Sequence, residues 1–390
     1  MWPPLSGTFV VEQIKALAPH IAITVAVLVP HPPNLSHYHW LRSPLVDKPD
    51  GPCRMQELGE NISIYYLRYR TIPELGKYLN SRQAWRALRH FLQQQREQFD
   101  LIHAHFAYTT GFAAAQAGRS FDLPVVVTAY GSDINFYVKR APKNLVAALY
   151  TIWGLRHATA VTALSKDLAT KIAALNISNR QITVIPLGID EKKFFPRGEK
   201  LSLRQQLQLP TDGPLFFFVG NWAPVKGLGF LLEAFARVRR QLPEAKLVMI
   251  GSGELEPVLK QQAQKLNIDT HTIWVGRKTH AEIPFWMSAA DFLVLPSLSE
   301  GFGLVVLESL ACGTPVIASR VGGVPEILTS ADYGIMVSPG DGEALARAML
   351  EAIDKTWDKK KLVDYAHANT WSERTQRLLK VYQSVLEQKA

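Results

Sequence analysis

The sequence predicts a doubly wound α/β protein that consists of two similar halves. Short apolar runs of strand length alternate with stretches of helical character along nearly the whole chain. Several of these runs are followed by loops that contain glycine, and no short sequence period repeats. Alternating strands and helices form parallel sheets covered by helices on both faces. Each half is therefore expected to be a Rossmann-like domain.

The first half contains six apolar runs that are expected to be strands. They lie at residues 21–29, 62–68, 101–105, 125–129, 160–164 and 183–186. Helices are expected at residues 8–18, 82–98, 111–118, 142–154 and 165–175. Residues 31–60 are rich in proline, aspartate and glycine, which predicts an irregular segment.

A polar, turn-rich stretch separates the two halves, and residues 196–213 are expected to be the domain linker. In the second half, strands are expected at residues 215–219, 246–250, 272–275, 291–295, 315–319 and 334–337. Helices are expected at residues 228–241, 254–266, 281–289, 342–354, 358–367 and 372–388. The predicted domains are residues 1–195 and 214–368. A last helix follows within residues 369–390, with Ser372 as its N-cap.

Composition narrows the class of protein. The 390 residues are 47% hydrophobic and 20% charged, a balance typical of a soluble protein of two domains. No apolar run approaches the roughly 20 residues that span a membrane, and no secretory signal is visible. Cys53 and Cys312 lack metal-ligand spacing and are expected to be reduced thiols of a cytoplasmic protein.

The net charge of +9 is compatible with three kinds of partner: nucleic acid, an anionic membrane or a phosphorylated small molecule. No zinc or RNA-binding motif is present, so nucleic acid is not expected as a partner. The other two kinds of partner stay open at this point.

One loop in the second half has the residues of a ligand site. It follows the expected strand at 291–295 and contains Gly301 and Gly303, where a helix should begin. Such glycines let the backbone approach a ligand and leave free N–H groups for an anion. Glu300 lies in the loop and Glu308 in the helix, and carboxylates at such a place can bind sugar hydroxyls. The simpler alternative is that both are solvated, but the apolar neighbours of Glu308 argue against it.

The run from Glu300 to Glu308, followed by Ala-Cys-Gly-Thr-Pro-Val-Ile-Ala-Ser, resembles the donor-site signature of the retaining glycosyltransferases of family 4. The resemblance implies the GT-B fold. In that fold two Rossmann-like domains face a central cleft and the C-terminal helix returns to the N-terminal domain. It also implies a metal-independent hexosyltransferase without cofactor. Such an enzyme moves a sugar from a nucleotide-diphosphate sugar to a polysaccharide, glycolipid or small-molecule hydroxyl, as in the synthesis of cell-envelope polysaccharide.

The resemblance also implies roles for individual residues. Lys226, in Gly220-Asn221-Trp222-Ala223-Pro224-Val225-Lys226-Gly227, would neutralise the leaving diphosphate, and Glu300 would hold the donor sugar. These two are the predicted catalytic residues, and Glu308 would bind the ribose hydroxyls. The other predicted donor-binding residues are Gly7, Thr8, Asn221, Gly251, Gly301, Phe302, Gly303 and Leu304.

The sequence departs from the family pattern at three places. Asn221 stands where the family commonly has arginine, and Tyr130 where it commonly has histidine. No strand precedes the loop that resembles the one after the family's first strand. Either the sequence starts late or the N-terminal sheet is expected to lack its usual central strand. These departures leave an alternative function open, that of a non-catalytic nucleotide-sugar-binding or scaffold protein.

Contacts to the acceptor or the donor sugar are expected from the first half. His103 and His105 should lie on the same face of a strand. A two-histidine metal site would need further ligands that the sequence does not show, so no metal is expected. The resemblance places His105, Tyr130 and Asp133 as contacts, although Asp133 could equally cap a helix.

Two helices of the first half combine basic and apolar residues. One contains Arg86 and Arg89 beside Trp85, and Lys143 precedes the apolar part of the other. This pattern fits an anionic membrane surface as a further partner at the inner face of the membrane. It also fits an ordinary helix with a buried and a solvated face.

Overall fold

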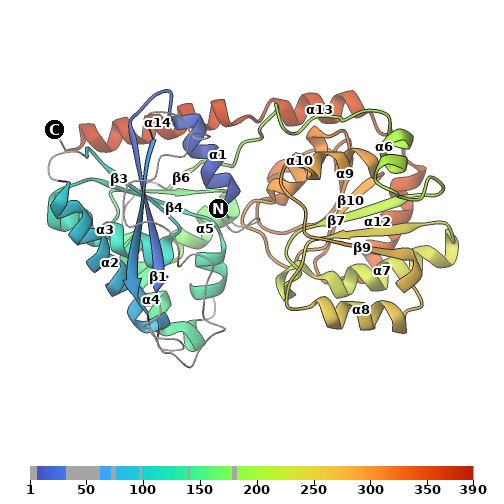
Figure 1. Ribbon diagram of the computed structural model, residues 1–390, viewed down its shortest axis with the longest axis horizontal. Helices are drawn as coiled ribbons and strands as arrows, with labels where there is room; N and C mark the ends of the chain where they lie inside the picture. The colour runs from blue at the N-terminus through green and yellow to red at the C-terminus, as the bar shows by residue number, and fades with distance from the viewer. Residues whose placement is uncertain are drawn as a thin grey trace. The chain divides into compact units, whose positions relative to one another are not determined.

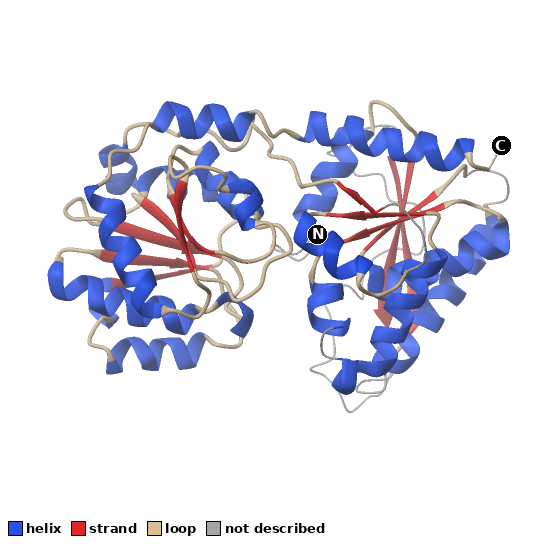
Figure 2. Cartoon of the chain, turned by 180° about the vertical axis from the view of Figure 1, so that it is seen from behind, coloured by secondary structure: helices blue, strands red, loops and turns tan. Residues whose placement is uncertain are grey.

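The computed structural model describes residues 7–31, 62–71, 76–95, 99–138, 141–177 and 182–389. The described chain forms two compact units (Figure 1). The N-terminal unit comprises Thr8–Pro186 and Ser372–Ala390, and the C-terminal unit contains Leu187–Trp371 together with Gly7. Each unit consists of parallel strands and surrounding helices, as Figure 2 shows by secondary structure. The predicted fold class of two α/β domains is confirmed.

The strands of the N-terminal unit form two sheets in the described residues. β1 (Ile23–His31) pairs with β2 (Ile62–Arg70) in one sheet. The other sheet has the order β3-β4-β5-β6, formed by Ile102–His105, Val125–Ala129, Ala160–Ala163 and Ile182–Val184. No described strand joins β1 to β3. The prediction that a central strand is lacking stays a prediction.

Helices pack on both sheets of the N-terminal unit. They are α1 (Thr8–Leu17), α2 (Gly76–Gln94), α3 (Phe112–Phe121), α4 (Ala141–His157), α5 (Lys166–Ala173) and α14 (Trp371–Glu387). One buried cluster joins α2 and α3 to β1, β2 and β3. Another joins α1 and β4 to α14 through Leu378 and Tyr382. The last helix thus packs in the N-terminal unit. It begins at Trp371, so Ser372 lies inside its first turn and is not the predicted N-cap.

The C-terminal unit contains one sheet of six parallel strands with the order β12-β11-β10-β7-β8-β9. Its strands are β7 (Leu215–Val219), β8 (Lys246–Ile250), β9 (Thr272–Gly276), β10 (Phe292–Leu295), β11 (Val316–Ser319) and β12 (Gly334–Val337). Its helices are α6 (Lys200–Gln206), α7 (Leu228–Gln241), α8 (Glu256–Lys265), α9 (Ile283–Ala289), α10 (Leu304–Ala311), α11 (Val324–Ile327), α12 (Gly342–Asp354) and α13 (Lys359–His367). β7, β8, β10 and β11 are almost entirely buried, which explains their continuous apolar sequences.

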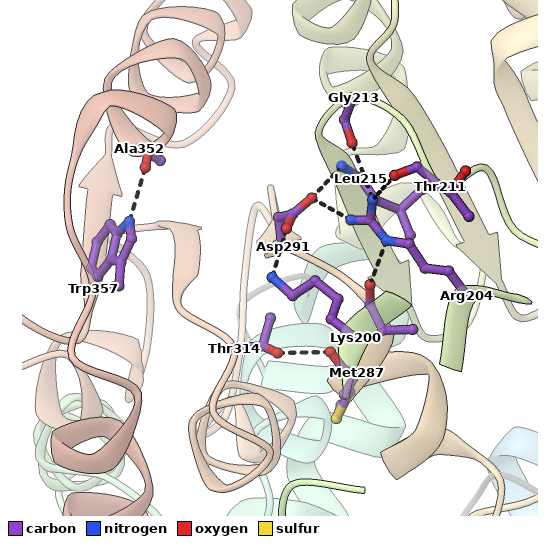
Figure 3. A network of polar contacts seen from close by, with 11 residues as sticks. Lys200, Arg204, Thr211, Gly213, Leu215, Met287, Asp291, Thr314, Ala352 and Trp357 are labelled. Carbon is purple, nitrogen blue, oxygen red and sulfur yellow. Dashed lines mark hydrogen bonds and ion pairs between the residues drawn. The ribbon is translucent and has the colours of Figure 1, made fainter. Parts of the chain in front are cut away.

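The prediction of a linker at residues 196–213 is wrong, because this stretch folds onto the C-terminal unit. It contains α6, whose Arg204 donates to the Asp291 carboxylate at 2.5 Å (Figure 3). Arg204 also donates to the Ala289 carbonyl oxygen at 3.0 Å. Asp291 also accepts from the Leu215 amide at 2.7 Å and from Lys200 at 2.6 Å. The local sequence around α6 is rich in turn residues and did not predict a helix. The contact of Arg204 with Asp291, 87 residues further along the chain, cannot be seen in the local sequence.

We expect Asp291→Ala to lower the free energy of unfolding by about 3 kcal/mol. The side chain of Arg204 is only 6% exposed and would be left without its carboxylate partner. Urea titration measures the loss. Lys200→Gln is the matched control, since the Lys200 side chain is 46% exposed and an exposed pair contributes less than about 1 kcal/mol. Equal losses in the two variants would contradict the role given to Arg204.

Candidate functional site

The strand order of the C-terminal unit reverses between β7 and β10. From β7 the chain proceeds to β8 and β9 on one side, and β10, β11 and β12 lie on the other side. Ligands of open α/β sheets bind outside the carboxyl ends of the strands, at the point where the order reverses. The loops that follow β7 and β10 carry Lys226 and Glu300, the two predicted catalytic residues.

These two loops are in direct contact. The Leu298 amide donates to the Val225 carbonyl oxygen at 2.8 Å. Gly227 has a φ of +63°, and a Cβ atom on it would lie 2.2 Å from the Pro296 carbonyl oxygen. Only glycine permits both this backbone conformation and this approach.

The contact brings Lys226 and Glu300 together. Lys226 Nζ lies 2.6 Å from Glu300 Oε1, and the Ser297 hydroxyl donates to the same oxygen at 2.7 Å. The two charged side chains are 23% and 12% exposed. The pair places one cation and one carboxylate side by side at the switch point.

The glycine-containing loop leads into α10 as the sequence predicts. Gly303, with a φ of 93°, is the N-cap of α10 and provides no side chain to bond the first amides of the helix. The amino end of a helix attracts anions through its N–H groups and its dipole. Phe302 is only 6% exposed, so this residue and Leu304 could contact a ligand mainly through their backbone amides.

Glu308 is buried in α10, as its apolar neighbours predict. The residue is 8% exposed, and one carboxylate oxygen lies 3.1 Å from Nε2 of His280. His280 comes from the loop after β9 and is not among the residues that the sequence analysis selected. Its place after a strand at the carboxyl edge of the sheet is the signal that could have identified it.

The loop after β8 completes this edge of the sheet. A Cβ atom on Gly251 would lie 1.9 Å from the Gly220 carbonyl oxygen, so the loops after β7 and β8 touch there. Asn221 is exposed next to this contact. Arg277, which follows β9, donates to the Ser252 hydroxyl and brings a guanidinium group to this loop. Arg277 is a second residue that the sequence analysis missed.

Polar residues of the N-terminal unit bond mainly to one another. His105 Nδ1 lies 2.7 Å from the Tyr130 hydroxyl, which also donates to Gln13 of α1 at 3.3 Å. His103 lies 2.6 Å from the Tyr382 hydroxyl and 2.7 Å from that of Thr128. The two imidazole rings are 4.5 Å apart, which confirms that they share a face of β3. The predicted contact residues His105 and Tyr130 thus lie within hydrogen-bonding distance of each other.

Burial keeps both histidines neutral. It lowers the pKa of His105 from 6.5 to about 4. The pKa of His103 is also lowered, by burial and then by the neighbouring His105. Burial raises the pKa of the Tyr130 hydroxyl, which is therefore a neutral hydrogen-bonding group.

Asp133 organises two loops of the N-terminal unit. Its carboxylate accepts from the backbone amides of Ala107 at 2.8 Å, Gly131 at 2.9 Å, and Tyr130 and Ile134 at 3.2 Å. The residue is 1% exposed, and burial raises the pKa of this carboxyl group. This geometry gives Asp133 a structural role, and its contact with a substrate stays a prediction.

Gly7 and Thr8 lie at the start of α1. The ring of the next residue, Phe9, packs against that of Tyr130, with 4.8 Å between the ring centroids. The start of α1 therefore contacts the loop after β4. The role of Gly7 and Thr8 at a diphosphate stays a prediction.

Two other kinds of site are absent from the described part of the chain. No group of three or more His, Cys, Asp or Glu side chains there could hold a metal ion. No described helix is both long and apolar enough to cross a bilayer.

Comparison with known proteins agrees with this architecture. Residues 6–188 match the model of a glycosyl transferase 4-like domain, and residues 199–369 match that of glycosyl transferases group 1. A putative teichuronic acid biosynthesis glycosyltransferase of Bacillus subtilis is 30% identical over 348 residues, which cover 89% of this chain and 84% of the relative. The N-acetyl-alpha-D-glucosaminyl L-malate synthase of Bacillus anthracis is 26% identical over 75% of each chain.

Solved structures show the same fold. Sucrose-phosphate synthase from Thermosynechococcus elongatus superposes with a TM-score of 0.81 at 23% identity, over 97% of this chain and 93% of its own. HepE from Anabaena, in complex with UDP and glucose, superposes with a TM-score of 0.73 at 21% identity, over 97% and 96%.

The two α/β units and the site at the switch point are those of a glycosyltransferase with the GT-B fold. The similarity over nearly the whole chain defines the family more narrowly. The chain belongs to the glycosyl transferases group 1, as the resemblance of the run from Glu300 to Glu308 implies.

We expect the stability of the protein to depend on the protonation of His105. Unfolded His105 takes up a proton near pH 6.5, but the folded protein resists this until about pH 4. The stability due to neutral His105 is therefore complete above pH 6.5 and decreases as the pH falls towards 4, by up to about 3 kcal/mol. Urea titrations across this range measure the slope, which His105→Gln should reduce. An unchanged slope in the variant would refute the expectation.

Proposed function

We propose that this glycosyltransferase takes its sugar from a nucleotide-diphosphate sugar bound at the switch point of the C-terminal unit. The observation that carries the proposal is the 2.6 Å pair of Lys226 and Glu300, next to the amino end of α10. A diphosphate needs cations and N–H donors, and a sugar needs carboxylate acceptors. The solved structure of HepE with UDP and glucose, a protein of the same fold, supports this choice of donor.

Each residue of the site has a proposed role. Lys226 and the first amides of α10 stabilise the negative charge of the leaving diphosphate, so that the reaction does not require a metal. Glu300 binds hydroxyl groups of the donor sugar, and Glu308 binds those of the ribose. Gly251 lets the nucleotide approach the backbone after β8, while Asn221 and Arg277 supply polar groups beside it.

We propose that transfer retains the anomeric configuration. The bond between the anomeric carbon and the diphosphate oxygen breaks, and a bond to the acceptor oxygen forms on the same face of the sugar. The proton of the acceptor hydroxyl goes to the leaving nucleoside diphosphate. Lys226 contributes because negative charge on the diphosphate increases as the first bond breaks.

The proposed acceptor is a hydroxyl group of a saccharide or of a lipid-linked saccharide, used on the cytoplasmic side at the inner face of the membrane. The names of two relatives support an acidic or phosphorylated acceptor. One is the N-acetyl-alpha-D-glucosaminyl L-malate synthase mentioned above, and another is the D-inositol 3-phosphate glycosyltransferase of Stackebrandtia nassauensis, 28% identical over 310 residues. Synthesis of a cell-envelope polysaccharide is the proposed setting, in keeping with the teichuronic acid relative.

A second candidate function is nucleotide-sugar binding without transfer. Two departures favour it: Asn221 replaces a cation at the expected diphosphate, and Tyr130 is held by His105 and Gln13. Donor binding without any release of nucleotide, across a panel of acceptors, would support this candidate.

We expect Lys226→Ala and Glu300→Ala each to lower the turnover number by about 100- to 1,000-fold, because each removes a preorganised group from the transition state. The assay measures release of nucleoside diphosphate from uridine, guanosine and adenosine diphosphate sugars. NMR of the product gives its anomeric configuration. An inverted product would refute retention.

Matched controls remove similar charges away from the site. Lys265→Ala changes an exposed lysine of α8, and Glu343→Ala changes a glutamate of α12 whose side chain is 65% exposed. Both should keep the turnover of the unaltered protein. If all four variants were equally active, the proposed site would be wrong.

A further inference from the structure

Three helices of the N-terminal unit contain no acidic residue. α2, α3 and α4 contain 19, 10 and 17 residues, and none of these is aspartate or glutamate. In the whole chain, 34 of 390 residues are acidic. The three helices pack against one another in the N-terminal unit (Figure 1). The positive charge of these helices is therefore not compensated by carboxylates within the helices.

A cavity of about 520 Å³ lies between these helices. Aromatic side chains from all three helices line it, among them Trp85 of α2, Phe112 of α3 and Trp153 of α4. The Phe112 ring lies 5.0 Å from that of Trp153 and 4.6 Å from that of Tyr150, so α3 and α4 are joined by ring contacts at the cavity. A cavity of this size can hold a small organic group.

Three arginines of α2 also line the cavity. Arg82, Arg86 and Arg89 are spaced by four and three residues, so they lie on one face of the helix. All three are exposed, and no carboxylate in the described part of the chain forms an ion pair with any of them. Arg86 has one weak hydrogen bond, to Gln83 at 3.4 Å. Like charges at this spacing destabilise a helix, and a bound anion would remove that cost.

The rim of the cavity is apolar on the side of α4. Leu149 lines the cavity and is 56% exposed, and Leu145, one turn earlier, is 57% exposed. Large hydrophobic side chains beside clustered arginines are typical of surfaces that lie in the interface of an anionic membrane. A soluble phosphorylated sugar would use the arginines but not the two leucines.

We propose that this cavity binds the phosphate of an anionic phospholipid headgroup while Leu145 and Leu149 enter the membrane interface. The arginines supply paired N–H donors that suit phosphate, and the aromatic rings contact the glycerol region. The inference builds on the proposed function at the inner face of the membrane. It assigns the contact to α2 and α4, outside the donor site.

The test is sedimentation of the full chain with phosphatidylcholine vesicles that contain or lack phosphatidylglycerol. Each basic residue near an anionic surface contributes roughly a factor of five to binding. We therefore expect the triple variant Arg82→Gln, Arg86→Gln, Arg89→Gln to bind the anionic vesicles about a hundredfold more weakly. The matched control is Arg237→Gln, Arg240→Gln, Lys265→Gln, which removes the same charge from exposed positions of α7 and α8 and should bind nearly normally.

Two further measurements locate the contact. Brominated phosphatidylglycerol should quench the fluorescence of Trp85 and Trp153, and Trp85→Phe, Trp153→Phe should lose most of the quenching. Leu145→Ser, Leu149→Ser alters only exposed side chains and should weaken binding at high salt. Circular dichroism confirms that each variant is folded.

Three results would overturn the inference. They are equal weakening by the two triple variants, equal binding to neutral and anionic vesicles, and binding of soluble glycerol 1-phosphate without binding of vesicles. The last would assign the cavity to a phosphorylated soluble acceptor. Nucleotide release is measured separately. The arginine variant should keep it with a soluble acceptor, so failure at the membrane and failure at the donor site can be distinguished.

Discussion

The parallel pairing of β7 with β10 is the constraint on which the C-terminal unit depends. At the amino ends of these strands, the Asp291 carboxylate holds both Arg204 and the Leu215 amide. At their carboxyl ends, Lys226 donates to Glu300. Because the strand order reverses at this pair, the following loops carry a cation and a carboxylate to the same point. The pairing of β7 with β10 at the centre of the sheet therefore also assembles the candidate site. A change that weakens this pairing would alter the positions of Lys226 and Glu300.

The polar residues of the two units are used differently. In the C-terminal unit, the Lys226–Glu300 pair is partly exposed and could exchange its partners for those of a ligand. In the N-terminal unit, His105, Tyr130 and Gln13 bond to one another, and Asp133 accepts four backbone amides. Breaking these buried hydrogen bonds would raise the free energy of the protein unless a substrate supplied a replacement for each of them. Donor binding thus has the stronger structural support, and the N-terminal residues that the sequence predicted as acceptor contacts mainly stabilise their loops.

Much of the fold could be predicted from the sequence, because buried parallel strands are continuous apolar runs with turn residues at both ends. For β4, β7, β8, α7 and α12 the predicted and observed ends coincide. The helix α6 was missed because its Arg204 depends on a carboxylate far along the chain. His280 and Gln13 were missed for the same kind of reason. Their partners, Glu308 and Tyr130, become neighbours only once the elements have packed.

Hydrogen exchange of the full chain, with and without a nucleoside diphosphate or its sugar, tests most directly whether the switch point binds the donor. Donor binding at the switch point predicts slower exchange at the amides of residues 301–305, at the start of α10, and in the loops after β7 and β8. It predicts no change at α6, whose Arg204 binds Asp291 at the opposite, amino end of these strands. Protection confined to other segments at saturating ligand, or no protection with any of the uridine, guanosine and adenosine diphosphates, would contradict the central claim.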